Sequence, residues 1–136
     1  MKVFVDTLFL IAQHNAKDSN HRRALQAFAD LLKQDARANF IITDYIFDEL
    51  ATFLMTRVSK HLAIKIGQNI LQDGRTTMIQ INKDRFYKAW ETFSSKQDQS
   101  WSFTDCTSFI VIQELAIQTA LSFDRHFRQF GIRVLP

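Results

Sequence analysis

The chain has 136 residues, a net charge of +3 and an isoelectric point near 9.2. Hydrophobic residues make up 46% of it and 13 residues are phenylalanine, which excludes a disordered chain and allows one hydrophobic core. No apolar run reaches the length of about 18 residues that suggests a membrane span, and no leader peptide precedes the first expected strand. One cysteine cannot form an internal disulfide. We therefore expect a single domain over residues 1–136 that works in the cytoplasm.

Short apolar runs alternate with segments of helical periodicity along the whole chain. Strands are expected at 2–6, 40–43, 76–81, 119–123 and 132–135. Helices are expected at 8–14, 20–37, 45–58, 60–72, 83–96, 105–118 and 124–130. Strands that alternate with helices are joined by right-handed crossovers, which place helices on both faces of a parallel sheet. The sequence therefore predicts an α/β fold with a mostly parallel central sheet.

Two acidic residues stand at the carboxyl ends of predicted strands. Asp6 closes the first apolar run, and Asp124 directly follows the run Ala-Leu-Ser-Phe near the end of the chain. Ligands of open parallel sheets bind in the crevice beyond these strand ends. The two carboxylates are therefore expected to face the same crevice.

Two further acids lie on helices, beside apolar faces. At 100° per residue, Glu49 projects at the margin of an apolar stripe, whereas Asp48 points away from it. Asp105 projects among apolar side chains near the start of its helix, whereas Glu114 points to the far side. Glu49 and Asp105 are therefore site candidates, and the other two acids are expected at the surface.

Each of these acids also has a simpler interpretation when it is taken alone. Asp105 could cap its helix, Asp6 could be a turn residue, and Asp124 could cap the helical turn that follows it. Four acids that converge on one sheet edge, however, are costly unless a cation neutralises them. Hard oxygen donors select Mg²⁺ or Mn²⁺. The set of Asp6, Glu49, Asp105 and Asp124 therefore predicts a divalent metal site.

The remaining reactive side chains are weaker candidates. Cys106 is expected to be buried filler, and the four histidines do not have the spacing of zinc ligands. Among them, His126 is the best placed to approach a substrate, although a cap or surface role is equally compatible with its position. The tryptophans and phenylalanines fit the core or an interface better than base stacking, although Trp101 and Phe103, which precede Asp105, could line the cleft.

Four stretches in order give the chain a family resemblance. They are Val3-Phe-Val-Asp-Thr7, Thr43-Asp-Tyr-Ile-Phe-Asp-Glu-Leu50, Ser102-Phe-Thr-Asp-Cys-Thr-Ser108 and Leu121-Ser-Phe-Asp-Arg-His-Phe127. With these stretches the chain resembles PIN domain (PilT N-terminus) nucleases over essentially all 136 residues, and more narrowly the VapC-type toxins. Cys106 stands where such proteins often have alanine, a departure that should not affect metal binding.

The resemblance implies a three-layer α/β/α sandwich and a set of residue roles. Asp6 and Asp105 would bind Mg²⁺ or Mn²⁺ directly, and Glu49 and Asp124 would complete the acidic set, partly through metal-bound water. The hydroxyls of Thr7 and Ser108 would hydrogen-bond and orient these carboxylates.

The implied activity is metal-dependent hydrolysis of RNA phosphodiester bonds by the toxin of a type II toxin–antitoxin pair. The implied partners are an RNA substrate, an antitoxin whose tail occupies the acidic groove, and a second copy of the chain, with apolar helices at 45–72 available for pairing. An RNA-processing nuclease without a toxin role and an inactive RNA-binding module are the alternatives. A dehalogenase-like phosphatase would need an acid where Leu8 stands, and a receiver domain would need paired early acids and a late lysine.

Overall fold

The computed structural model describes all residues from Met1 to Pro136. The strands are β1 (Lys2–Val5), β2 (Asn39–Thr43), β3 (Thr76–Ile79), β4 (Thr119–Leu121) and β5 (Arg133–Leu135). The helices are α1 (Thr7–His14), α2 (His21–Gln34), α3 (Asp44–Arg57), α4 (Lys60–Gln72), α5 (Lys83–Ser95), α6 (Phe103–Glu114) and α7 (Arg125–Phe130). All expected elements are present.

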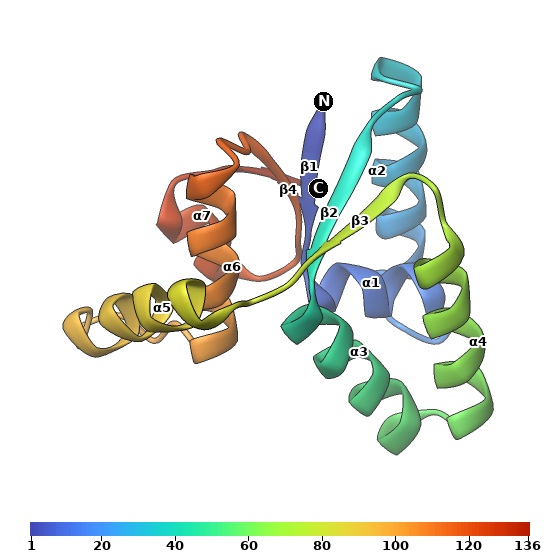
Figure 1. Cartoon of the computed structure of the whole chain (residues 1–136). Coiled ribbons are helices and arrows are strands. Elements are labelled where there is room, and N and C mark those ends of the chain that lie inside the picture. The colour runs from blue at the N-terminus through green and yellow to red at the C-terminus, as the bar shows by residue number, and fades with distance from the viewer.

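The five strands form one parallel sheet in the order β3-β2-β1-β4-β5. Helices α1 to α4 cover one face of the sheet, and α5 to α7 lie on the other side (Figure 1). The predicted α/β fold class and its three layers are therefore confirmed. No helix is long and apolar enough to cross a membrane.

The central strand β1 shows why this sheet needs helices on both faces. It is hydrogen-bonded to β2 on one side and β4 on the other, and Val3, Phe4 and Val5 are at most 3% exposed. Because side chains alternate across a strand, Phe4 faces α6 and α7, where its ring stacks on Phe127 at 5.9 Å between centroids. Val5 faces the opposite layer, beside Leu10 of α1. A strand buried on both faces reads as an unbroken apolar run.

The limits of helix α6 differ from the predicted range 105–118. Ser102 caps its amino end, since its hydroxyl accepts a hydrogen bond from the Asp105 backbone nitrogen at 3.0 Å. The Asp105 carboxylate in turn accepts one from the Ser102 nitrogen at 3.0 Å, which completes a capping box. The carboxyl end comes at Glu114 because Ala116 has a φ of 52° and cannot continue a right-handed helix. The alternative of Asp105 as the cap residue is thus wrong, because it stands three positions inside the helix.

The register of the sheet aligns the strand ends that matter for the site. Val5 of β1 pairs with Leu121 of β4, and the Asp6 backbone nitrogen donates a hydrogen bond to the Leu121 carbonyl oxygen at 3.0 Å. Thr43 ends β2 and caps α3, accepting a hydrogen bond from the Ile46 nitrogen at 3.0 Å. The residues that follow β1, β2 and β4 therefore start from the same edge.

Candidate active site

A groove of about 310 Å³ lies at this edge of the sheet, and all four predicted acids line it. Its ten lining residues are Asp6, Thr7, Leu8, Ile11, Glu49, Phe53, Ser102, Asp105, Asp124 and His126. They come from both helical layers, so the groove crosses the end of the sheet. Asp48 is exposed and does not line the groove, in agreement with the helical projection.

Asp6 is the most deeply placed of the four acids, with 4% exposure. Its backbone is still extended, with φ −87° and ψ 160°, so its side chain continues the alternation of β1 and lies on the Phe4 side of the sheet. The pKa of its carboxyl is raised from 3.8 to about 7, chiefly by burial and to a smaller extent by the charges of Asp105 and Asp124, while hydrogen bonds from the Thr7 backbone and the Ser122 hydroxyl oppose the shift. Asp6 is therefore a carboxylate whose ionised form needs a cation nearby.

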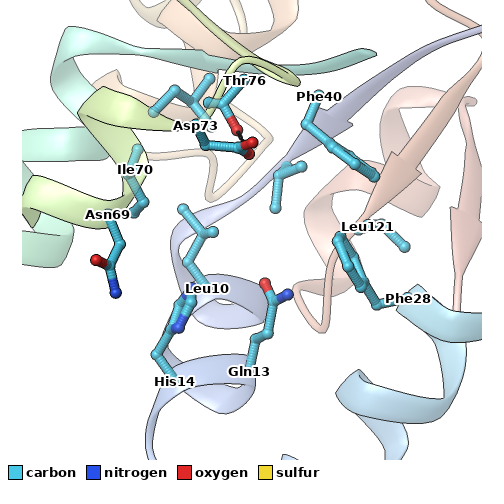
Figure 2. A pocket seen from close by; sticks show the side chains of 12 residues that line it. Leu10, Gln13, His14, Phe28, Phe40, Asn69, Ile70, Asp73, Thr76 and Leu121 are labelled. Carbon is cyan, nitrogen blue, oxygen red and sulfur yellow. Dashed lines mark hydrogen bonds between the residues drawn. The ribbon is translucent and has the colours of Figure 1, made fainter. Parts of the chain in front are cut away.

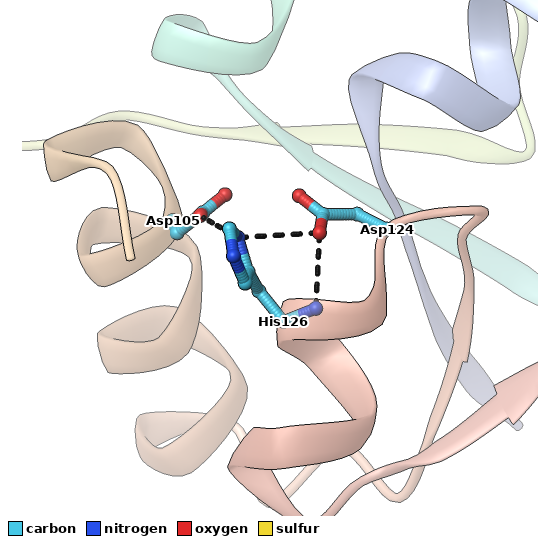
Figure 3. A group of neighbouring side chains, drawn as sticks. All are labelled: Asp105, Asp124 and His126. Carbon is cyan, nitrogen blue, oxygen red and sulfur yellow. Dashed lines mark hydrogen bonds and ion pairs between the residues drawn. The ribbon is translucent and has the colours of Figure 1, made fainter. Parts of the chain in front are cut away.

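Asp105, Asp124 and His126 form a compact group of side chains that also line the groove (Figure 3). The imidazole Nδ1 of His126 lies 2.9 Å from Asp105 Oδ2 and 3.2 Å from Asp124 Oδ1. Burial, followed by the charge of Asp124, raises the pKa of the Asp105 carboxyl, while its hydrogen bonds to Ser102 and His126 oppose this shift. Asp124 also caps α7, accepting a hydrogen bond from the His126 nitrogen at 2.9 Å. Asp124 therefore has both roles that the sequence allows: it caps α7 and it lines the groove.

Glu49 and Thr7 meet at the rim of the groove. The Thr7 hydroxyl donates a hydrogen bond to Glu49 Oε1 at 2.6 Å, joining the first turn of α1 to the second turn of α3. Thr7 is 5% exposed, whereas Glu49 is exposed. The buried hydroxyl therefore holds a solvent-facing carboxylate over the groove.

The hydrogen bond expected from Ser108 is absent, and Trp101 and Phe103 pack against other aromatic side chains rather than in the groove. The Ser108 hydroxyl is fully buried and has no hydrogen-bond partner, because the Asp105 carboxylate turns back to Ser102 and across to His126. Trp101 and Phe103 do not line the groove. Trp101 packs edge-on against Phe109 at 4.9 Å between centroids, and Phe103 joins the aromatic side chains of α5.

Two groove contacts had no clear signal in the sequence. The Ser122 hydroxyl donates a hydrogen bond to Asp6 Oδ2 at 3.1 Å and accepts one from the Asp124 nitrogen at 2.9 Å. The position of His126, two residues after Asp124, indicates an approach to substrate or a cap or surface role, whereas the structure shows it in contact with two of the four acids. A hydroxyl at a strand end, two residues before an acid, is the only sequence signal that Ser122 offers.

Cys106 and Glu114 lie outside the groove, as the sequence predicts. Cys106 is buried, and burial followed by the Asp105 charge raises the pKa of its thiol to about 11, so it stays protonated and unreactive at neutral pH. Glu114 points away from the groove, as projected, and forms an ion pair with Arg85 of α5 at 2.7 Å.

A second cavity, of about 200 Å³, lies between α1, α2 and α4 on the face of the sheet that these helices cover (Figure 2). Apolar side chains such as Leu10, Phe28 and Ile70 form most of its wall, with His14 and Asp73 among its polar residues. None of the four acids reaches it. It is therefore a separate, mostly apolar site.

The donor set of the acidic groove fits a divalent metal ion. Asp105, Asp124 and His126 each offer one ligand atom, and these atoms lie within 4.8 Å of one another. Buried Asp6 adds a further hard oxygen donor on the same groove. Acids that line one groove at the carboxyl ends of parallel strands are the arrangement that metal-assisted hydrolases of phosphate esters use.

Comparison with known proteins gives the family. The PIN domain family model matches residues 3–132, so the chain belongs to the PIN domain family, which has a nuclease fold. It is similar to the 23S rRNA-specific endonuclease VapC20 of Mycobacterium tuberculosis strain H37Rv, with 29% identity over 136 residues and 98% of each protein covered. The family expected from the sequence motifs is confirmed.

Solved structures support the same conclusion. The crystal structure of M. tuberculosis VapC20, described as a Sarcin-Ricin loop cleaving toxin, superposes with a TM-score of 0.88 at 27% identity, covering 98% of this chain and 99% of that one. VapBC2 from Rickettsia felis, solved with a DNA fragment from the promoter, gives a TM-score of 0.71 at 12% identity, covering 98% and 97%. FitAcB from Neisseria gonorrhoeae gives 0.66 at 11%, covering 100% and 97%. The last two similarities show the fold alone.

Proposed function

We propose that this protein is a divalent-metal-dependent endoribonuclease and the toxin of a type II toxin–antitoxin pair, with residues 1–136 acting as one nuclease domain. The observation that carries the proposal is the convergence of Asp6, Glu49, Asp105 and Asp124 on one groove. The similarity to VapC20 over 98% of the chain supports RNA as the substrate. The single cysteine, Cys106, is free and buried, which is compatible with our proposal that the protein acts in a reducing cytoplasm.

Each groove residue has a proposed role. Asp6 and Asp105 would bind Mg²⁺ or Mn²⁺ directly, and Glu49 and Asp124 would complete the set. Such an ion supplies a Lewis acid that activates water and stabilises charge on the phosphodiester oxygens. The support for these roles is the raised pKa of both Asp6 and Asp105, since acids that resist ionisation next to each other are stabilised by a shared cation.

The hydroxyl groups around the acids are proposed to position them. Thr7 fixes one oxygen of Glu49, and Ser122 fixes one oxygen of Asp6 while holding the backbone of Asp124. A carboxylate with one oxygen already bonded presents the other in a fixed direction. Two hydroxyls thus orient the carboxylates of Glu49 and Asp6 and hold the backbone of Asp124.

The central test is cleavage of 23S rRNA, because this is the RNA named for the VapC20 relative. The purified full chain is incubated with the rRNA and Mg²⁺ or Mn²⁺, beside samples with EDTA, an Asp6→Asn variant and a matched Asp48→Asn control. We expect defined cleavage products that EDTA and Asp6→Asn abolish and that Asp48→Asn leaves intact. Full cleavage by Asp6→Asn would rule out the proposed site.

A growth assay separates the toxin from an RNA-processing nuclease without a toxin role. Expression of the wild-type chain is expected to arrest growth, and the Asp6→Asn chain is expected to be harmless at the same protein level. Normal growth with wild type, together with rRNA cleavage in vitro, would favour the processing role.

We further propose that a cognate antitoxin binds this protein. The support for this partner is the fold shared with the VapBC and FitAB proteins, and we expect the antitoxin's tail to occupy the acidic groove. Co-expression with the product of the neighbouring reading frame should restore growth.

A second copy of the chain is the other proposed partner. One face of α5 carries large aromatic side chains that pack beside Phe103 of α6 and still have 38–59% exposure. They are Phe86, Tyr87, Trp90 and Phe93. Exposed aromatic side chains gathered on one helix are typical of a protein interface rather than a free surface. The alternative pairing surface is the groove between α3 and α4, which the exposed side chains of Met55, Ile64 and Leu71 line.

A further inference from the structure

We propose that His126 is a nitrogen ligand of the metal site, that Ser100 orients its ring, and that this mixed donor set makes the protein prefer Mn²⁺ to Mg²⁺. The inference rests on the proposed metal-dependent function and names the metal for it. It adds one histidine, His126, to the four acids proposed to hold the metal.

The distances around His126 suit a shared cation as well as a shared proton. Its Nδ1 lies 2.9 Å from Asp105 Oδ2 and 3.2 Å from Asp124 Oδ1 (Figure 3). Donor atoms on neighbouring vertices of an octahedron with bonds of about 2.1 Å lie about 3.0 Å apart. Both carboxylate oxygens thus lie from Nδ1 at the spacing of neighbouring ligands, and the three donor atoms lie within 4.8 Å of one another, so a metal ion can replace the bridging proton.

The other ring nitrogen of His126 has the partner that a metal-binding imidazole needs. Its Nε2 lies 3.1 Å from the hydroxyl oxygen of Ser100, in the segment between α5 and α6. A histidine ligand usually donates its second N–H to an oxygen, which fixes the tautomer and the direction of the ring. With the proton on Nε2 facing Ser100, the lone pair of Nδ1 faces the two carboxylates. The His126 side chain is 17% exposed, so the ring is held rather than free.

The four acids alone are compatible with Mg²⁺ and with Mn²⁺, and the nitrogen ligand distinguishes between these two ions. Mg²⁺ takes oxygen ligands and keeps several waters, so an imidazole contributes little to its binding. First-row divalent ions accept imidazole nitrogen, and Mn²⁺ is the member of that series that also suits a majority of carboxylates. A site with three or four carboxylates and one imidazole therefore favours Mn²⁺.

Spectroscopy of the unmodified protein tests the ligand directly. The full chain is loaded with Mn²⁺ and examined by electron spin-echo envelope modulation, which detects ¹⁴N bound to the ion. We expect ¹⁴N modulation in wild type and in His61→Gln, a matched control on the exposed face of α4, and none in His126→Gln. Absence of ¹⁴N modulation in Mn²⁺-loaded wild type overturns the proposal.

Calorimetric titration with each metal tests the preference and the role of Ser100. We expect His126→Gln to weaken Mn²⁺ binding by about tenfold or more and Mg²⁺ binding by less than about threefold, and Ser100→Ala to weaken Mn²⁺ binding to a smaller extent. Equal weakening for both metals would mean that His126 only positions the carboxylates, and would overturn the proposal. Circular dichroism confirms that each variant is folded.

The same titrations distinguish this inference from the proposed function. Wild type that binds both metals, with an unchanged ratio of affinities in His126→Gln, contradicts the nitrogen ligand and leaves the metal-dependent nuclease standing. Wild type that binds neither metal contradicts both.

Discussion

Ser122 and Asp6 are 116 positions apart, yet the Ser122 hydroxyl donates a hydrogen bond to Asp6 Oδ2 at 3.1 Å in the buried floor of the groove. The pairing of β1 with β4 places them together, because Val5 and Leu121, the residues just before them, are partners in the sheet. This contact lowers the pKa of Asp6 against the larger effect of burial. The hydroxyl therefore favours the ionised form that binds a cation.

Replacement of Ser122 tests this contact. Ser122→Ala removes the donor to Asp6 and the acceptor for the Asp124 nitrogen, so we expect metal affinity and the rate of RNA cleavage to fall by about tenfold. Metal titration and single-turnover cleavage measure the change, with Ser94→Ala on the exposed face of α5 as the matched control. Unchanged metal affinity in Ser122→Ala would contradict the positioning role.

The raised pKa of Asp6 predicts how the stability of the metal-free protein changes with pH. The unfolded carboxyl has a pKa of 3.8 and the folded one about 7, so between these values the folded state holds a proton that the unfolded chain releases. The free energy of unfolding should therefore fall as the pH rises from about 4 to 7, by at most about 1.4 kcal/mol per pH unit from this group. Denaturant unfolding in EDTA at pH 5 and pH 8 measures this loss.

Asp6→Asn is the matched variant for this pH effect. An amide has no charge to bury, so the variant should be more stable than wild type at pH 8 in EDTA, with a smaller difference at pH 5. Saturating metal should reverse the order at pH 8, because the ion stabilises only the ionised wild-type site. Equal pH dependence in both proteins would show that Asp6 does not titrate in this range.

Thr7→Val removes the hydroxyl that holds Glu49 while keeping the shape of the side chain. We expect the cleavage rate to fall several-fold because the Glu49 carboxylate loses its fixed direction. Stability should change by about 1 kcal/mol or less, because Glu49 is exposed and water can replace the lost hydrogen bond. Thr56→Val on the exposed face of α3 is the control, since its hydroxyl bonds only to backbone carbonyl oxygens. Equal rates for the two variants would remove Thr7 from the site.

The proposed pairing face is tested by a charge in its centre. Trp90 is 51% exposed on α5, and Trp90→Glu should convert the dimer into a monomer because a carboxylate would be buried in the interface. Sedimentation velocity measures the mass of each protein. Leu71→Glu, at a site that is 59% exposed on α4, is the control and should stay dimeric. Loss of the dimer in Leu71→Glu alone would place the interface on α4 instead.

The four acids of the groove show which part of the site can be predicted from the sequence. Asp6 and Asp124 were predicted from the ends of apolar runs, and Glu49 was separated from Asp48 by helical projection, because both signals depend only on local periodicity. The groove contains these residues and excludes Asp48. Helix limits were less exact, since α6 ends at Glu114 where the backbone of Ala116 turns to a positive φ, and no glycine marks this position.

The contacts between the acids could not be predicted in the same way. Ser122 reaches Asp6 through the register of two strands, and His126 reaches Asp105 through the packing of α7 beside α6. The direction of the Asp105 carboxylate, toward Ser102 and His126, left the Ser108 hydroxyl without the partner expected for it. Apolar spacing and strand ends are properties of the chain, so the layers, the parallel sheet and the four acids of the groove could be predicted from the sequence. The hydroxyls that bond Glu49 and Asp6, and the imidazole that contacts Asp105 and Asp124, became visible in the folded protein, because those contacts depend on strand register and on side-chain rotamers of elements far apart in sequence.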